Sequence, residues 1–280
     1  MEWKGRRTSH NVEDRRGSRT KGLVGGGIGT IILVVLYALL GGDPSTIIGD
    51  LQSNNSQISS PYQETAPEQE LREFASVVLA ETEDVWAALF KQQGARYVEP
   101  TLVLYTDAVT SACGTAASSA GPFYCPGDQK VYLDLSFYND LQTQFQAPGD
   151  MAMAYVIAHE VGHHVQYQMG TLQEVQSLRG RVSQTQYNQY SVRLELQADY
   201  YAGVWAHYAE RTNLLEPGDI QEALNAASAV GDDRIQKKYQ GEVEPDTFTH
   251  GTSEQRQHWF MKGYQTGTLE GGDTFKASSL

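Results

Sequence analysis

The stretch Ala158-His159-Glu160-Val161-Gly162-His163 determines how the rest of this 280-residue sequence is interpreted. Positions i and i+4 lie on one face of a helix, so His159 and His163 can both bind one metal ion. Glu160 projects about 100° away, from where it can reach a water held by that ion. The pattern therefore predicts a helix with two metal ligands and a general base, as zinc-dependent hydrolysis requires.

The residues around this motif predict a buried helix, because residues 151–165 are mostly apolar or small. Asp150 is expected to cap its N-terminus, and Gly170 is expected to end it. Imidazoles and carboxylates in a core must be hydrogen-bonded, paired or metal-bound. Burial therefore argues against a chance match to the motif. His164 is interpreted as a packing residue or as a partner of a ligand, not as a ligand.

A catalytic zinc site needs a third protein ligand and keeps its fourth position for water. Glu195 is the best candidate, since it lies in a second apolar, helix-prone segment with Asp199 at i+4 on the same face. We predict that Glu195 binds one Zn²⁺ ion together with the two histidines. Asp199 is predicted to accept the spare N–H of His159 and so to select its tautomer. A solvated acidic helix edge is the alternative, which the apolar neighbours disfavour.

With these motifs the sequence resembles a family, the putative neutral zinc metallopeptidases, which are bacterial membrane-anchored proteins with a gluzincin-like core. Other stretches also resemble it: residues 11–17, 113–114, 121–126, 131–137 and 250–253, followed by Arg256, Trp259, Phe260 and Gly263. The resemblance implies an α+β fold, with a mainly helical zincin-like metalloprotease domain, a small β-sheet and a single transmembrane helix before it. It also implies peptidase activity.

Residues 22–42 contain no charged residue and would span roughly 31 Å as a helix, close to the thickness of about 30 Å of a bilayer core. Seven Lys or Arg precede this run within residues 1–21, and the positive-inside rule then places residues 1–21 in the cytoplasm. We expect a single-pass anchor rather than a cleaved signal peptide, because the run is long and lacks a convincing cleavage site. Gly25 and Gly29 alone do not predict a dimer.

The predicted organisation is a basic cytoplasmic segment (1–21), a transmembrane helix (22–42), a polar linker (43–68), a zinc metallopeptidase domain (69–266) and a flexible tail (267–280). The domain is accordingly placed outside the cytoplasm, at the bacterial cell membrane. Of the 21 basic and 34 acidic residues in the chain, 7 and 3 fall in residues 1–21, which leaves the rest with a net charge of −17. This charge disfavours nucleic acid as a partner. The predicted partners are a peptide or protein substrate and, through residues 22–42, the lipid bilayer.

Periodicity predicts a helix from residue 70, strands at 101–106 and 131–135, and helices at 172–182, 191–210, 217–229 and 254–263. By resemblance, the strand at 131–135 is the candidate edge that pairs with an extended substrate. A purely structural strand is the alternative. Cys113 and Cys125 are the only cysteines, and we expect a disulfide between them if the domain lies in an oxidising compartment. Metal binding by these cysteines is disfavoured, because no second pair has the spacing of a zinc finger.

Two further residues near the C-terminus are candidates for the site. Thr252 to Gln255 has the form of a capping box, which places His250 in a loop before a helix that carries Arg256. A loop histidine or arginine over the cleft can donate a hydrogen bond to an oxyanion. We therefore predict His250 as a catalytic residue and Arg256 as a transition-state stabiliser. The alternatives are an exposed or backbone-bonded histidine and an arginine in an ion pair.

These observations predict a membrane-anchored zinc metallopeptidase that hydrolyses peptide bonds, with Glu160 as the general base for a zinc-activated water. The alternative is a catalytically inactive zinc-containing protein with a binding or quality-control role at the cell envelope. A closed site of four ligands would mark that alternative, and no fourth histidine or cysteine is conveniently placed. Hydrolysis of a non-peptide amide would use the same residues.

Overall fold

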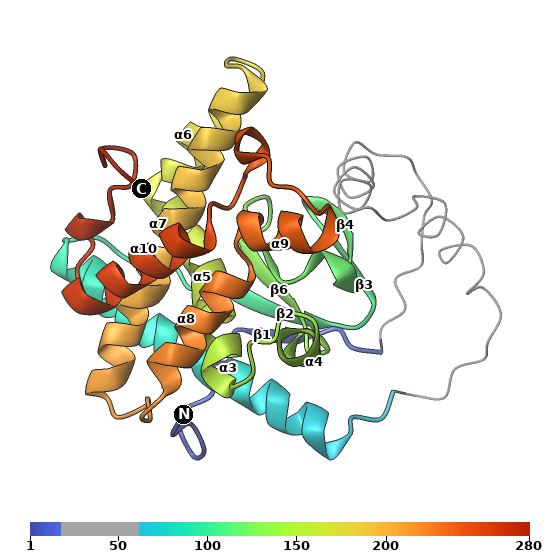
Figure 1. Cartoon of the computed structure of the whole chain (residues 1–280). Coiled ribbons are helices and arrows are strands. Elements are labelled where there is room, and N and C mark those ends of the chain that lie inside the picture. Colours follow the sequence, from blue (N-terminus) through green and yellow to red (C-terminus); the bar gives the residue numbers. More distant parts are fainter. Residues whose placement is uncertain (18–61) are drawn as a thin grey trace.

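The main sheet has four strands in the order β1-β2-β6-β5 in the computed structural model, which describes residues 1–17 and 62–280 (Figure 1). β1 (Val12–Asp14), β2 (Thr101–Tyr105) and β6 (Lys130–Asp134) run parallel, while β5 (Phe123–Cys125) runs antiparallel to β6. A separate hairpin consists of β3 (Ala108–Ser111) and β4 (Gly114–Ala117). Four of the five residues of both β2 and β6 are buried, as expected of parallel strands covered on both faces.

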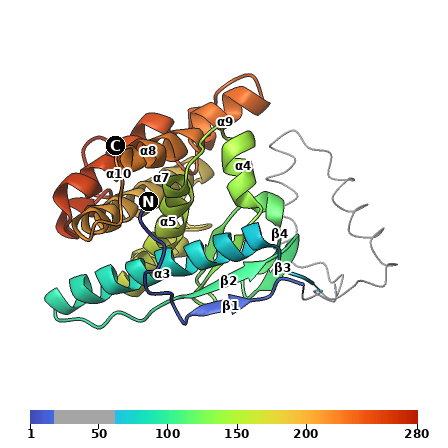
Figure 2. The same cartoon turned by 90° about the horizontal axis from the view of Figure 1, so that it is seen from below.

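Helices make up the larger part of the described chain. One long helix, α3 (Ala66–Gln92), begins at a capping box formed by Thr65 and Glu68 and runs alongside the sheet (Figure 2). The others are α4 (Phe137–Thr143), α5 (Asp150–Met169), α6 (Thr171–Ser177), α7 (Gln184–Arg211), α8 (Asp219–Ala229), α9 (Asp232–Tyr239) and α10 (Ser253–Thr266), with short 3-10 turns η1 (Ser118–Ala120), η2 (Pro245–Thr247) and η3 (Glu270–Gly272). The predicted class, α+β with mainly helices and a small sheet, is confirmed.

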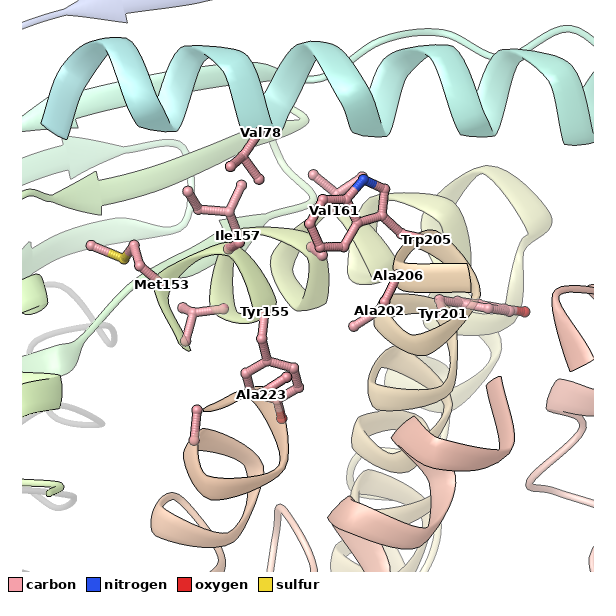
Figure 3. Close-up of a cluster of buried hydrophobic side chains, with 14 of the residues drawn as sticks. Val78, Met153, Tyr155, Ile157, Val161, Tyr201, Ala202, Trp205, Ala206 and Ala223 are labelled. Carbon is pink, nitrogen blue, oxygen red and sulfur yellow. The ribbon is translucent and has the colours of Figure 1, made fainter. Parts of the chain in front are cut away.

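The helix with the two histidines, α5, lies inside the helical layer. Val78 of α3 approaches Ile157 and Val161 from one side, and Ala202 and Trp205 of α7 approach from another (Figure 3). Complete burial of one such aliphatic side chain contributes about 1.5–3 kcal/mol. The predicted metal-binding motif therefore lies on a helix that packing holds on several sides, as its apolar sequence predicted.

The ends of α5 agree with the prediction at one terminus only. Gly170 ends the helix in the left-handed conformation, with φ at 85°. At the other end Gly149 takes the N-cap position, and Asp150 is already the first helical residue. The carboxylate of Asp150 instead lies 3.0 Å from the amino group of Met1, which also contacts Glu216 at 2.6 Å.

The N-terminal residues differ from the prediction of a separate basic segment at 1–21. Residues 1–17 are part of the folded body, because β1 pairs with β2 and places Val12 beside Leu102. Met1 and Trp3 are buried within the main hydrophobic core. The local sequence suggested a solvent-exposed basic segment next to a membrane span, because the partners of these residues lie far along the chain.

The predicted flexible tail at 267–280 is wrong as well. η3 lies within it, Thr274 is completely buried, and Leu280 packs against the core. Arg193 of α7 donates hydrogen bonds to the carbonyls of Thr274 and Ala277. These contacts hold the C-terminal residues against α7.

The predicted transmembrane helix at 22–42 and most of the linker lie outside the described residues. Within residues 1–17 and 62–280, no helix combines the length and apolar character that a membrane span requires. The folded body starts before the predicted boundary at residue 69, since α3 begins at Ala66.

Candidate metal centre

Three predicted ligands from two helices converge on one point. The Nε2 atom of His159 lies 3.2 Å from one carboxylate oxygen of Glu195, and the Nε2 atom of His163 lies 3.4 Å from the other. His159 and His163 come from α5, and Glu195 comes from α7. In the described part of the chain these three residues form a group whose ligand atoms all lie within 4.8 Å of one another.

The spacing of these atoms fits zinc. A tetrahedral ion with bonds of about 2.0–2.1 Å holds its ligand atoms about 3.3–3.4 Å apart. The separations of 3.2 and 3.4 Å, each measured to a different oxygen of Glu195, are of this size. Two imidazoles and one carboxylate also form a donor set that catalytic zinc sites use. The residues therefore fit one Zn²⁺ ion, with Nε2 as the ligating atom of each histidine.

A glycine inside the motif lets the two helices approach each other. A Cβ atom on Gly162 would lie 3.0 Å from the carbonyl oxygen of Ala198 in α7 and 3.2 Å from its Cα. Real Cβ atoms seldom come that close, so a side chain at position 162 would push α7 away. Glu195 and Asp199 lie on the same stretch of α7 as Ala198, so the small size of Gly162 helps them to reach the histidines.

The Nδ1 atom of His159, which does not face the candidate metal position, is bonded to a buried ionic network. Its Nδ1 donates to Asp199 at 2.8 Å, as predicted, and Tyr155 donates to the same carboxylate at 2.5 Å. Arg256 completes the network with bonds of 2.8 and 3.0 Å to the two oxygens of Asp199. Burial alone would raise the pKa of Asp199, but the charges of Arg256 and His159 lower it to about 2. Asp199 is thus an anion that fixes the tautomer of His159.

The position of Arg256 differs from its predicted role as a transition-state stabiliser. Its side chain is only 4% exposed, and its Nε and both Nη atoms are engaged by Asp199, Tyr155 and the carbonyl of Val230. Four of the five guanidinium N–H groups are therefore already used. The structure favours the ion-pair interpretation, in which Arg256 neutralises Asp199 behind the ligands.

The Nδ1 atom of His163 is bonded to the neutral side-chain amide of Gln166. Nδ1 donates to the side-chain oxygen of Gln166 at 2.8 Å, and the amide nitrogen of Gln166 donates to the carbonyl of Leu194 at 2.6 Å. Gln166 is completely buried. Because Leu194 precedes Glu195, this one side chain connects a ligand on α5 to the backbone beside the ligand on α7.

The predicted general base lies beside the ligands in a largely buried position. Glu160 is 8% exposed, and burial raises its pKa although the neighbouring histidines act in the opposite direction. A backbone hydrogen bond from Tyr124 of β5 also lowers it. A carboxylate with a raised pKa is better suited to accept and return a proton near neutral pH than an exposed one.

The strand next to this carboxylate is β5, not the predicted strand at 131–135. β6, which contains residues 131–134, lies inside the sheet between β2 and β5 and cannot offer a free edge. β5 is the edge strand on the side of α5. His164 is not a ligand, as predicted: its Nδ1 bonds to the hydroxyl of Tyr124, and its Nε2 donates to the carbonyl of Val98.

The predicted disulfide between Cys113 and Cys125 is present, with a Cα–Cα distance of 5.8 Å. It connects the turn between β3 and β4 to the last residue of β5. The edge strand next to Glu160 is therefore covalently tied to the adjacent hairpin.

His250 lies in a loop before α10, as predicted, near Glu195 and with 47% of its side chain exposed. Its Nδ1 is 3.2 Å from Asp232, whose other oxygen accepts the backbone N–H groups of Thr249, His250 and Gly251. Partial burial lowers the pKa of His250, but the hydrogen bond to Asp232 and the charge of Glu195 outweigh this and raise it. The carboxylate of Asp232 thus positions the loop, and together with Glu195 it raises the pKa of the imidazole.

Another group of carboxylates, Asp150, Asp219 and Glu222, also has a spacing that a cation could use. The amino group of Met1 lies 3.0 Å from Asp150 and 3.5 Å from Asp219. Glu222 accepts the backbone N–H of Met151. These carboxylates already have partners within the fold and do not form a second candidate metal centre.

Four residues around the ligands were not predicted from sequence: Tyr155, Gln166, Asp232 and Tyr124. The spacing of Tyr155 and Gln166, four residues before His159 and three after His163, places each on the face of a ligand, and this signal could have identified them. Asp232 and Tyr124 reach the site through the fold, and their local sequence carries no such signal.

Comparison with known proteins agrees with this geometry. A family model described as "Putative neutral zinc metallopeptidase" matches residues 1–275. The "Uncharacterized protein YpfJ" of Escherichia coli (strain K12) is 46% identical over 286 residues, which covers 99% of this chain and 100% of that protein. The "Uncharacterized protein Rv2575" of Mycobacterium tuberculosis is 48% identical over 196 residues, or 66% of this chain and 65% of that protein.

No solved structure matches the chain significantly, so its zincin-like character stays a prediction. The family model nevertheless covers both metal-binding helices, the two cysteines and the loop of His250. On the strength of that match, the chain belongs to the putative neutral zinc metallopeptidase family.

Proposed function

We propose that this protein is a zinc-dependent peptidase with a zincin-like site. One observation carries the proposal: two imidazoles and one carboxylate converge at the spacing of zinc ligands, with the buried carboxylate of Glu160 next to the first ligand. In the described part of the chain the cluster has three members. Three protein ligands leave a position for water, which is typical of catalytic rather than structural zinc.

When bound, zinc lowers the pKa of a water in the open position towards about 7 and polarises the carbonyl under attack. Glu160 accepts the proton of the attacking water and delivers it to the leaving amine as the C–N bond breaks. Asp199 and Gln166 keep both ligand imidazoles in the tautomer with a free Nε2. His250, whose Nδ1 is held by Asp232, donates a hydrogen bond to the oxyanion.

The substrate class that this site suits is an extended peptide. β5 is an edge strand whose Tyr124 donates its backbone N–H to Glu160. The remaining backbone groups of an edge strand can pair with a peptide. The paired backbone would present a peptide carbonyl next to the ligands. Peptide or protein substrates are therefore proposed as the partners of the site.

The test uses zinc-loaded full-length protein and a fluorogenic peptide library, with and without 1,10-phenanthroline. The Glu160→Gln variant should retain zinc but lose at least about 10²-fold in rate, because a general base contributes about 10²–10⁴-fold. Glu174→Gln, an exposed position on α6, is the matched control and should keep full activity. Equal rates for Glu160→Gln and the wild type would refute the general-base role.

The same experiment addresses the alternative of an inactive zinc-containing binding protein. Stoichiometric zinc without cleavage of any library peptide would favour that alternative. Cleavage of only small non-peptide amides would keep the chemistry and change the substrate class.

A further inference from the structure

The first residues of the chain are built into the same folded body as the metal centre. β1 pairs in parallel with β2, and backbone bonds of 2.8 Å join Leu102 to Asn11 and Arg15 to Leu104. Ser9 and Asn11 donate to the buried carboxylate of Glu83 in α3. These bonds connect residues 1–17 to both the sheet and the helix that lies along it.

The basic residues of this segment are used in ion pairs with the body. Five of the seven basic residues of the segment 1–21 lie in its described part, and four of these five contact carboxylates of residues 64–83. The pairs are Lys4–Glu70 (2.7 Å), Arg6–Glu81 (3.0 Å), Arg7–Glu83 (3.1 Å) and Arg16–Glu64 (2.6 Å). The positive-inside rule treats such charges as a free flank of a membrane span. Here they bind the acidic body.

Residues 16 and 17 lie beside residue 62 in the fold, although the segment 18–61 separates them in sequence. Arg16 is 2% exposed, pairs with Asp14 and Glu64, and stacks over Tyr62 at 5.5 Å. A Cβ atom on Gly17, whose φ is +76°, would lie 2.3 Å from the Cβ of Tyr62. The described residues that border the segment 18–61 are therefore in contact.

This contact conflicts with a single crossing of a membrane by the apolar run 22–42. One crossing would separate residues 1–17 from residues 62–280 by about 30 Å of hydrocarbon, in which no sheet edge or ion pair could bridge the two sides. A second span needs about 20 predominantly apolar residues. The sequence 43–61 is too polar to provide it, with Asp43, Asp50 and many Ser, Asn and Gln.

We propose that residues 1–17 and the body of residues 62–280 face the same compartment, so the apolar run does not carry the chain across the membrane. The predicted arrangement, with residues 1–21 in the cytoplasm and the catalytic domain outside, is replaced by one in which any attachment to lipid begins and ends on one side. The disulfide between Cys113 and Cys125 favours an oxidising compartment for both parts.

The pair Lys4–Glu70 offers a direct test, because its two members lie on opposite sides of the segment 18–61 in sequence and touch in space. Their side chains are 74% and 55% exposed. The full chain is expressed in bacterial cells as Lys4→Cys or as Glu70→Cys and treated with a membrane-impermeant maleimide, before and after lysis. The unsubstituted chain reports the background from the native cysteines.

Our proposal expects the two variants to give the same labelling pattern. Labelling of both in intact cells places both parts outside, and labelling of both only after lysis places both in the cytoplasm. Labelling of Glu70→Cys in intact cells with Lys4→Cys protected until lysis is the result of a single-pass anchor and would overturn the proposal.

A cross-linking experiment covers the case in which a substitution disturbs local folding. The double variant Lys4→Cys/Glu70→Cys carries a protease site inserted after Asp43 and is treated with a short bis-maleimide in membranes. The two fragments should stay joined after cleavage, whereas those of each single variant should separate. Joined fragments in detergent but separate fragments in membranes would contradict the proposal.

Discussion

The two candidate ligand histidines of α5 have different hydrogen-bond partners at Nδ1. His159 is backed by an anion, Asp199, which is itself neutralised by Arg256 at 2.8 Å. His163 is backed by the neutral amide of Gln166. The first support depends on charge, and the second depends on the geometry that joins α5 to α7.

This difference indicates separate roles for Asp199 and Gln166. A carboxylate behind an imidazole raises the basicity of the ligand as well as fixing its tautomer. An amide fixes the tautomer without adding charge. Because Gln166 also bonds to the carbonyl of Leu194, its second duty is to hold the helix of Glu195 at the correct distance. Removal of each support should therefore have a different consequence.

The largest effect is expected on the stability of the metal-free protein. In the Asp199→Ala variant the buried guanidinium of Arg256 has lost its partner, and breaking a buried pair in this way costs about 3–5 kcal/mol. Asp273→Ala breaks an ion pair of similar length, 2.8 Å to Lys276, with side chains 41% and 89% exposed. Solvent screens such a surface pair, so its loss should cost much less. Urea denaturation of both variants measures the difference, and equal losses would mean that the network of Asp199 contributes no more than a surface pair.

The next effect is on zinc affinity, which separates the two supports. Loss of an outer partner of a ligand typically costs about 10–100-fold in metal affinity. We expect Asp199→Asn near the upper end of that range, because it removes charge, and Gln166→Met near the lower end. Gln173→Met, at an exposed position of α6, should bind zinc like the wild type. Competition with a chelating dye measures the zinc affinity of the three variants. A larger loss of zinc affinity for Gln166→Met than for Asp199→Asn would contradict the proposed roles of the two residues.

The parts of this site that sequence predicted are those with local helical spacing. His159, His163, Glu195 and Asp199 stand at i and i+4 on two apolar helices, and the structure brings them together. The capping box at Thr252 and the disulfide were predicted for the same reason, because their signals lie within a few residues or in a single pair of cysteines.

The features that the sequence did not reveal depend on partners far along the chain. β1 has three residues, and its flanking arginines suggested a membrane flank because Glu64 and Glu83 are more than 45 positions away. The polar residues 267–280 gave no sign of the carbonyls that bind Arg193. β6 showed the expected alternation, but whether a strand is central or at an edge depends on which strands pair with it, and β5 has only three residues.

The smallest effect concerns a third imidazole, His250, which has a carboxylate partner like His159 but is half exposed. Partial burial lowers its pKa from the ordinary value of 6.5, but the hydrogen bond to Asp232 and the charge of Glu195 outweigh burial and the charge of Arg256 and raise the pKa. A raised pKa means that the protonated donor persists at higher pH and is lost as the pH rises through that pKa.

If protonated His250 binds the oxyanion, Asp232→Asn should move the basic limb of kcat/KM to lower pH and change the rate little below it. Solvent screens so exposed a pair, which is why this effect ranks last. An unmoved basic limb in the Asp232→Asn variant, with zinc still bound, would mean that the basic limb reports another group and that Asp232 only holds the loop.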